Sequence, residues 1–162
     1  GTYKVHRADL DEADGESYGP SVSSNGRYIA FYSDASNLVS GDTNGVNDIF
    51  LRDTQNSTTS RINVATDGTQ ADSTSYVPAI SGDSRYVAFV SAASNLVSSD
   101  TNSANDVFLH DTQNSTTSRI NVATDGTQTD SLYFSHSPTV SSNGRYVAFY
   151  SRAPNLVAGD TK

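Results

Sequence analysis

A long stretch of this sequence, DTQNSTTSRINVATDGTQ, occurs twice without a change, at Asp53–Gln70 and at Asp111–Gln128. The residues before each copy also match, and a third, incomplete unit follows the second. The anchor prolines Pro20, Pro78 and Pro138 give spacings of 58 and 60 residues. A period of this size indicates a solenoid, a propeller or an array built from one structural unit. The duplication therefore leaves few folds open to the chain.

The composition decides which class of unit is repeated. Apolar residues make up 35% of the chain, and Ser, Thr, Asn, Asp and Gly take the place of the missing ones. This mixture is typical of turn-rich β-proteins, and no segment shows apolar residues at helical spacing. The sequence therefore predicts an all-β fold. No apolar run approaches the ~20 residues of a membrane-spanning helix, so a membrane span is not expected.

Charge and sulfur content narrow the function classes. The formal net charge is -8, which repels phosphate backbones and argues against nucleic acid as a partner. An acidic surface favours cations, basic proteins or uncharged sugars. The chain contains no Cys, so disulfides and thiol chemistry are excluded. It contains no Met either, which predicts a processed product or a fragment.

Each unit is predicted to form four short strands. In the first unit we expect them at Ser21–Ser23, Arg27–Ser33, Asp48–Arg52 and Ser60–Ala65, where β-branched and aromatic residues gather between turn signals. The Asn-Gly pair that ends at Gly26 supplies the positive φ of a hairpin turn. The second strand is apolar on both faces, which predicts a sheet covered on both sides.

Neighbouring units must cover one another, because a single small sheet with two apolar faces cannot bury both of them. We expect the chain to open on the last strand of an incomplete unit, at Thr2–Ala8. The predicted boundaries divide the repeat domain, residues 1–162, into an outer strand with its loop, two complete units and a partial unit, at 1–19, 20–77, 78–137 and 138–162.

The repeated pattern P-x-[IV]-S-x-[ND]-[GS]-R-Y-[IV]-A-F-x-S, followed by D-[IV]-F-L-x-D, resembles the TolB-like β-propeller repeat, a WD-repeat-like blade. The resemblance covers essentially the whole chain. It implies four-stranded antiparallel blades, with the first strand of each blade lining a central channel and the fourth strand outermost. The variant with N-L-V-x-G-D-T-N between the second and third strands is similar to repeats of exported bacterial proteins, which implies an extracellular or periplasmic location.

The chain supplies fewer than three blades, whereas propellers need ~4–8. Two explanations stay open: the chain is part of a longer propeller, or several chains assemble one ring. Either explanation leaves sheet faces and strand edges exposed in a lone chain. We therefore expect self-association.

A polar loop before the third strand of each unit is a candidate calcium site. Carboxylate and amide oxygens at its first, third and seventh positions supply about half of the ~6–8 oxygens that Ca²⁺ prefers. The alternative is that these side chains form Asx-turns and hold the loop without a metal. The candidate ligands are Asp42, Asn44 and Asp48 in the first unit and Asp100, Asn102 and Asp106 in the second.

A second repeated cluster, Thr-Asp-Gly-Thr-Gln at 66–70 and 124–128, is first of all a turn. With Tyr76, Tyr133 or Phe134 nearby, it is also a candidate for binding a sugar through hydrogen bonds and ring stacking. The three histidines, His6, His110 and His136, lack metal-binding spacing. We expect them to be solvated or hydrogen-bonded at the surface.

No catalytic motif stands out. Ser is abundant, but no Gly-x-Ser-x-Gly elbow is present, and almost every acidic residue recurs as part of the repeat. The leading hypothesis is a non-enzymatic exported module that binds protein or glycan through its loop rims or acts as a scaffold, with calcium as a candidate stabiliser. A carbohydrate-active enzyme domain and a structural self-assembling repeat protein are the alternatives.

Overall fold

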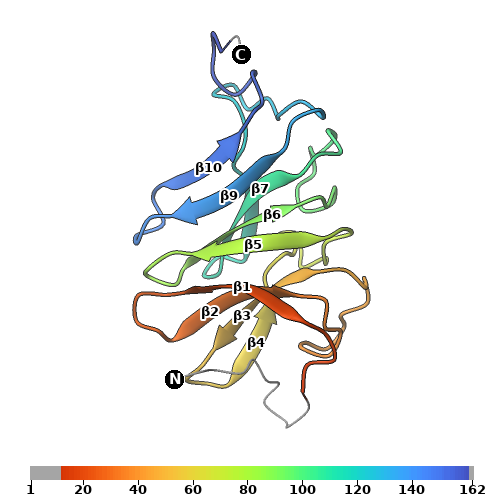
Figure 1. Cartoon of the computed structure of the whole chain (residues 1–162), viewed down its shortest axis with the longest axis vertical. Coiled ribbons are helices and arrows are strands. Elements are labelled where there is room, and N and C mark those ends of the chain that lie inside the picture. The colour runs from red at the N-terminus through yellow and green to blue at the C-terminus, as the bar shows by residue number, and fades with distance from the viewer. Residues whose placement is uncertain (1–11, 161–162) are drawn as a thin grey trace.

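The computed structural model describes residues 12–160, and every regular element within them is a β-strand (Figure 1). The described residues therefore hold no helix that is long and apolar enough to cross a membrane. The strand predicted at Thr2–Ala8 lies outside the described residues. The ten strands are β1 (Ser17–Val22), β2 (Tyr28–Ser33), β3 (Asp48–Asp53), β4 (Thr58–Arg61), β5 (Ser75–Ile80), β6 (Tyr86–Ser91), β7 (Asp106–Asp111), β8 (Thr116–Arg119), β9 (Ser135–Val140) and β10 (Val147–Ser151).

The strands form three antiparallel sheets that fan out along the molecule (Figure 1). The first sheet has the order β1-β2-β3-β4 and the second β5-β6-β7-β8, while the third pairs β9 with β10. The first strands of successive sheets, β1, β5 and β9, lie side by side. The prediction of four-stranded antiparallel units in an all-β chain is confirmed.

Both faces of the second strand are covered, as its two apolar faces predict. Phe31 on one face of β2 stacks on Phe50 of β3, with ring centroids 5.7 Å apart. Ala30 on the other face belongs to a core shared with Val87 and Phe89 of the second sheet. Burying a side chain as large as Val87 or Phe89 stabilises a protein by ~1.5–3 kcal/mol. The contact between sheets is therefore a main source of stability.

The first strand of the unit is longer than its predicted span of Ser21–Ser23. β1 begins at Ser17 and contains Pro20, because a β-bulge between Tyr18 and Ser21 shifts the register there. Proline is tolerated at a bulge, where its missing N–H breaks no ladder bond. Gly19 has a φ of +58° at this bulge, which is the left-handed conformation that glycine adopts most easily.

The fourth strand is shorter and earlier than the predicted Ser60–Ala65. β4 ends at Arg61, after which the chain turns away toward the loop rim. The side chain of Asn63 then takes the place of a ladder partner, since its Oδ1 accepts a bond from Ile49 N at 2.9 Å. Val64 forms an isolated bridge with Gln70.

The β1–β2 turns of successive sheets are joined through their backbones, at the end of the sheets opposite the loop rim. Ser24 N donates to Gly82 O at 3.2 Å, and Asp83 N donates to Ser142 O at 2.8 Å. A Cβ atom on Gly82 would lie 2.5 Å from Ser24 Oγ and 3.1 Å from Ser142 Cα. The close approach of the three turns therefore favours glycine at position 82.

Candidate ligand-binding site on the third sheet

The residues predicted to bind calcium in the first sheet meet at the start of β3. Asp48 is fully buried, and Asn44 Nδ2 donates to its two carboxylate oxygens at 3.0 and 3.1 Å. Arg61 reaches them from β4: its Nη1 lies 3.1 Å from Asp48 Oδ2 and 3.2 Å from Asp42 Oδ1. A guanidinium group therefore stands between the two carboxylates.

The second sheet repeats this arrangement. Asn102 Nδ2 donates to both oxygens of the buried Asp106 at 3.2 Å. Arg119 Nη1 lies 3.3 Å from Asp106 Oδ2 and 3.2 Å from Asp100 Oδ1. The six candidate ligands thus form two groups of three, and each group holds an arginine.

Two asparagines complete these groups, and sequence reasoning missed them. Asn63 Nδ2 donates to Asp48 Oδ1 at 2.5 Å, and Asn121 Nδ2 donates to Asp106 Oδ1 at 2.6 Å. Both asparagines are fully buried. The available signal was their fixed place, two residues after the arginine, in the duplicated stretch.

The electrostatics of these groups bear on the calcium prediction. Burial raises the pKa of the Asp42 carboxyl, the neighbouring Asp48 carboxylate raises it further, and Arg61 lowers it. Asp100 shows the same pattern. Within residues 12–160, no three acidic or histidine side chains gather as a metal site would require. Arg61 already supplies a positive charge at this position, so the donor set does not fit a dication well. Calcium binding stays a prediction that no observation here supports.

The repeated Thr-Asp-Gly-Thr-Gln cluster at 66–70 forms hydrogen bonds within its own turn. Thr69 N donates to Asp67 Oδ1 at 2.9 Å, and Gly68 between them has a φ of +87°. Gln70 Nε2 donates to Thr43 Oγ1 at 2.6 Å, which ties the cluster to the loop before β3. The second copy repeats these bonds. The cluster therefore stabilises its own turn and ties it to the loop before the third strand of its sheet.

The loop before the third sheet departs from the template. It runs over 130–135, where the preceding unit has 72–75, and this insertion of two residues accounts for the spacing of 60 instead of 58. The inserted side chains are apolar and face solvent: Leu132 is 81% exposed and Phe134 is 54% exposed. Clustered exposed apolar side chains indicate an interaction site.

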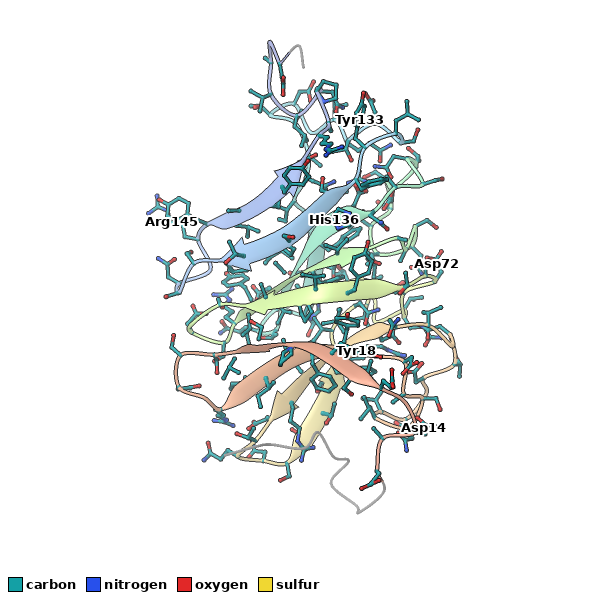
Figure 2. The ribbon with its side chains drawn as sticks, viewed as in Figure 1. Asp14, Tyr18, Asp72, Tyr133, His136 and Arg145 are labelled. Carbon is teal, nitrogen blue, oxygen red and sulfur yellow. The ribbon has the colours of Figure 1, made fainter. Side chains whose placement is uncertain are left out.

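A pocket of about 380 Å³ lies beneath this loop. Two of its residues, His136 on β9 and Tyr150 on β10, are directly opposite each other in the β9–β10 ladder. Figure 2 shows Tyr133 at the loop end of the third sheet, beyond His136. The pocket is lined by Leu132, Tyr133, Phe134, His136, Tyr150 and Arg152.

Ring contacts and one hydrogen bond shape the pocket. The rings of Phe134 and His136 meet edge to face, with centroids 5.6 Å apart. The ring of Tyr76 on the second sheet also meets that of His136, with centroids 6.1 Å apart. Arg152 Nε donates to the hydroxyl of Tyr150. The structure thus places Tyr133 and Phe134, two of the three aromatic residues proposed for sugar binding, in the pocket with His136, and the third, Tyr76, against the ring of His136. The sequence analysis gave His136 no binding role.

The pocket is particular to the third unit. His136 stands where the first two units have Tyr18 and Tyr76, and Arg152 stands where they have Asp34 and Ala92. The sequence signal that was available was this pair of substitutions beside the insertion.

The expectation that all three histidines lie at the surface is wrong for His110, which is 5% exposed. Its Nδ1 lies 2.9 Å from Thr117 Oγ1, and that hydroxyl donates to Val64 O at 2.5 Å. Because the single hydroxyl hydrogen goes to Val64, His110 Nδ1 must be the donor. Burial lowers the pKa of His110. The expectation for His6 lies outside the described residues.

Solved structures share this arrangement of sheets. A putative TolB from Agrobacterium tumefaciens is 20% identical, with a TM-score of 0.52 over 89% of this chain and 45% of that chain. The β-propeller domain of the Trilobed protease from Pyrococcus furiosus is 15% identical, with a TM-score of 0.53 over 83% of this chain and 34% of that one. The fold is that of TolB-like β-propeller blades.

The first two sheets are therefore complete TolB-like blades, and the third is part of one. The tricorn protease also matches, at 12% identity and a TM-score of 0.54, over 88% of this chain and 11% of that chain. The chain thus spans between 11% and 45% of the length of these neighbours. No protein-family model and no curated protein matches the sequence. At these identities the likeness establishes the fold alone.

Proposed function

We propose that this chain is a non-enzymatic ligand-binding module of β-propeller type and that its ligand binds in the pocket of the third sheet. The observation that carries this proposal is the loop at 130–135, where exposed apolar side chains interrupt the repeat template. In the preceding unit the corresponding loop is closed by template bonds, such as that from Ser94 N to Asp72 Oδ1 at 2.9 Å.

The proposed ligand is an uncharged glycan. The faces of Tyr133, Phe134 and Tyr150 suit the apolar faces of sugar rings, and His136 and Arg152 supply hydrogen bonds to hydroxyl groups. The net charge of -8 disfavours polyanionic ligands. A pocket volume of about 380 Å³ lies within the range of small-ligand sites.

The make-up of the pocket supports binding over glycoside hydrolysis. Glycosidases place two carboxyl groups ~5–9.5 Å apart across the scissile bond. None of the six residues that line this pocket is Asp or Glu. The proposal therefore assigns recognition, and not bond cleavage, to this surface.

The proposal includes export and self-association. Export is supported by the resemblance of the repeat to those of exported bacterial proteins, and fractionation of the source cells tests it. Self-association is supported by the open face of the third sheet, where Tyr146 and Tyr150 are 64% and 52% exposed. Light scattering tests this part: a monodisperse monomer at every concentration contradicts it.

Titration of the chain against a panel of neutral oligosaccharides tests the glycan proposal. Phe134→Ala is expected to weaken binding about ten- to a hundredfold, because stacking a sugar on this ring buries apolar surface worth ~1.5–3 kcal/mol. Val22→Ala serves as the matched control, since Val22 is 55% exposed on β1, outside the pocket. Binding that Phe134→Ala leaves unchanged contradicts the site, and turnover of any panel member contradicts the non-enzymatic assignment.

A further inference from the structure

A second pocket lies between the two complete blades, apart from the one on the third sheet. It has a volume of about 470 Å³. Residues of the segment 60–68, which begins in β4, form the side of the first blade, and His110 with the β7–β8 turn forms the side of the second. We call it the interblade pocket. Because both blades hold all four strands, its walls do not depend on the third sheet.

His110 is the residue of this pocket that departs from the repeat. The equivalent position in the first blade is Arg52, whose Nη1 donates to Ser57 O at 2.8 Å and to Thr59 Oγ1 at 3.2 Å. Those two bonds lie within the hairpin of Arg52 itself. His110 instead is 95% buried, at 5% exposure, and lines the space between the blades. The substitution thus replaces a cation by an aromatic ring nitrogen at the pocket wall.

The second ring nitrogen of His110 is an acceptor without a partner. Since Nδ1 donates to Thr117, the neutral ring carries its lone pair on Nε2. No described residue bonds to Nε2, and this atom is not closed off from solvent. Burial lowers the pKa of His110, which keeps the ring neutral at pH 7. A ligand that donates a hydrogen bond to Nε2 therefore satisfies a polar group that the blades leave unpaired.

Asp67 adds a negative charge to the same pocket. Its Oδ1 accepts a bond from Thr69 N at 2.9 Å, and this bond lowers the pKa of the Asp67 carboxyl. The carboxylate is therefore ionised at pH 7, and no described residue forms an ion pair with it. The cation that lines the pocket, Arg61, is already paired with Asp42 and Asp48. The pocket thus presents one neutral acceptor and one uncompensated carboxylate.

The remaining wall that bears on the ligand is apolar. Leu51 and Ile62, which are 8% and 3% exposed, belong to the core between the blades, and they border the pocket together with Val64. An alkyl or aryl group placed against them buries apolar surface. The volume of about 470 Å³ lies within the range of small-ligand sites.

We propose that the interblade pocket binds an organic ammonium ion, that is, a protonated amine on an apolar stem. The stem lies against Leu51, Ile62 and Val64, while the ammonium group donates to His110 Nε2 and faces the carboxylate of Asp67. The net charge of -8 also favours a cationic ligand over a neutral one. An anion is disfavoured, because it would meet two acceptors and a negative charge.

A free amine and the side chain of a lysine share this chemistry, so the test uses one probe for each. Phenethylammonium and N-acetyl-lysine amide are titrated separately into the isotope-labelled chain, and both are expected to shift the signals of His110 and of residues 64–68 in a saturable way. The uncharged 2-phenylethanol should bind at least tenfold more weakly than phenethylammonium. Tighter binding of phenethylammonium assigns the pocket to free amines, whereas tighter binding of N-acetyl-lysine amide assigns it to lysine side chains.

Two substitutions test the acceptors. His110→Arg introduces the residue of the first blade, and Ser115 and Thr117 stand where Ser57 and Thr59 bind Arg52, so the variant is expected to fold. It should weaken the binding of phenethylammonium at least tenfold, because it removes the acceptor and adds a like charge. Asp67→Asn should weaken binding about threefold or more, because it removes the charge but keeps an oxygen for Thr69 N.

Asp125→Asn is the matched control for Asp67→Asn. Asp125 occupies the same turn of the second unit, where its Oδ1 accepts a bond from Thr127 N at 2.9 Å, and it does not line the interblade pocket. Amine binding should be unchanged in this variant. Thermal unfolding checks that each variant is folded, and the two aspartate substitutions decide the test even if His110→Arg is not.

Three results would overturn the proposal: neither probe binds, 2-phenylethanol binds as tightly as phenethylammonium, or Asp67→Asn and Asp125→Asn weaken binding equally. Phe134→Ala changes only the pocket of the third sheet and should leave amine binding as it is. Failure of the glycan proposal and failure of this one can therefore be told apart.

Discussion

The first two blades and the third sheet share one sequence template, but their polar groups face different surroundings. Asp48 and Asp106 are fully buried, each with an arginine and two asparagines as partners. In the third sheet, the polar side chains of His136 and Arg152 line a pocket open to solvent. The duplicated groups hold the blades together, whereas the residues that break the duplication form the candidate ligand site. In this molecule the repeated residues therefore stabilise the blades, and the residues that depart from the repeat form the surface proposed for ligand recognition.

The largest expected effect comes from the buried group. Asp48→Ala removes the fully buried carboxylate that binds Arg61 and that accepts bonds from the amides of Asn44 and Asn63. Breaking such a pair from one side typically costs ~3–5 kcal/mol, and urea denaturation measures this loss of unfolding free energy. Arg152→Ala in the third sheet should change it by less than ~0.5 kcal/mol. Equal losses from the two substitutions would remove the distinction between the two regions.

The bulge in the first strand of each unit gives the next largest effect. Val77 has a φ of +53°, which is strained for a β-branched side chain. Its counterpart in the first blade is Gly19, where an added Cβ would lie 2.8 Å from Tyr32 Cε1. Val77→Gly is expected to stabilise by about 1 kcal/mol, after the backbone entropy of glycine is deducted.

Gly19→Val is the reciprocal substitution and is expected to destabilise by on the order of 1–3 kcal/mol. Thermal unfolding of both variants checks the pair. Destabilisation by Val77→Gly would show that the valine side chain contributes more through packing than it costs in strain.

A smaller effect is expected from pH. Burial holds the pKa of His110 below the 6.5 of an ordinary histidine, so the unfolded chain binds this proton more tightly than the folded one. The stabilisation is therefore complete above pH 6.5 and is lost as the pH falls below that value. Between pH 7 and 5, the slope of unfolding free energy against pH should be smaller in His110→Gln. The difference should be at most the ~1.4 kcal/mol per pH unit that one proton contributes. Identical slopes would show that His110 does not titrate differently in the two states.

Calcium is expected to have the smallest effect. Arg61 and Arg119 lie between the carboxylates that would bind it, so the melting temperature should be nearly the same in EDTA and in millimolar Ca²⁺. A rise of several degrees with Ca²⁺ would restore the calcium interpretation of these loops. It would also require the arginine side chains to move aside.

The sequence predicts the blade well because its signals are local. The Asn-Gly turn, the apolar second strand and the D-[IV]-F-L strand each depend on neighbouring residues, and the structure has a turn at the first and strands at the other two. The bounds of β1 and β4 were less predictable. A bulge admits Pro20 into β1, and the side chain of Asn63 replaces a ladder partner after β4.

The candidate site was only partly predictable, because its contacts span the chain. Arg61 meets Asp48 through the register of the β3–β4 hairpin, which a list of carboxylates does not reveal. The pocket depends on the pairing of Tyr150 with His136 and on a loop conformation with no counterpart in the other units. His110 is buried at a contact with the preceding blade, where Thr117 bonds both to His110 and to the carbonyl of Val64. None of these contacts follows from residue spacing alone.

Backbone bonds join successive sheets at both ends: from Ser24 N to Gly82 O and from Asp83 N to Ser142 O at the turns, and from Ser75 N to Asn47 O and from Ser135 N to Asn105 O at the loop rim. The two-residue insertion at 130–135 leaves the bond from Ser135 N in place, so the loop before the first strand of a sheet accommodates a change of length. Randomised segments placed in this loop, one per blade, would offer a route to new binders built on one repeated unit.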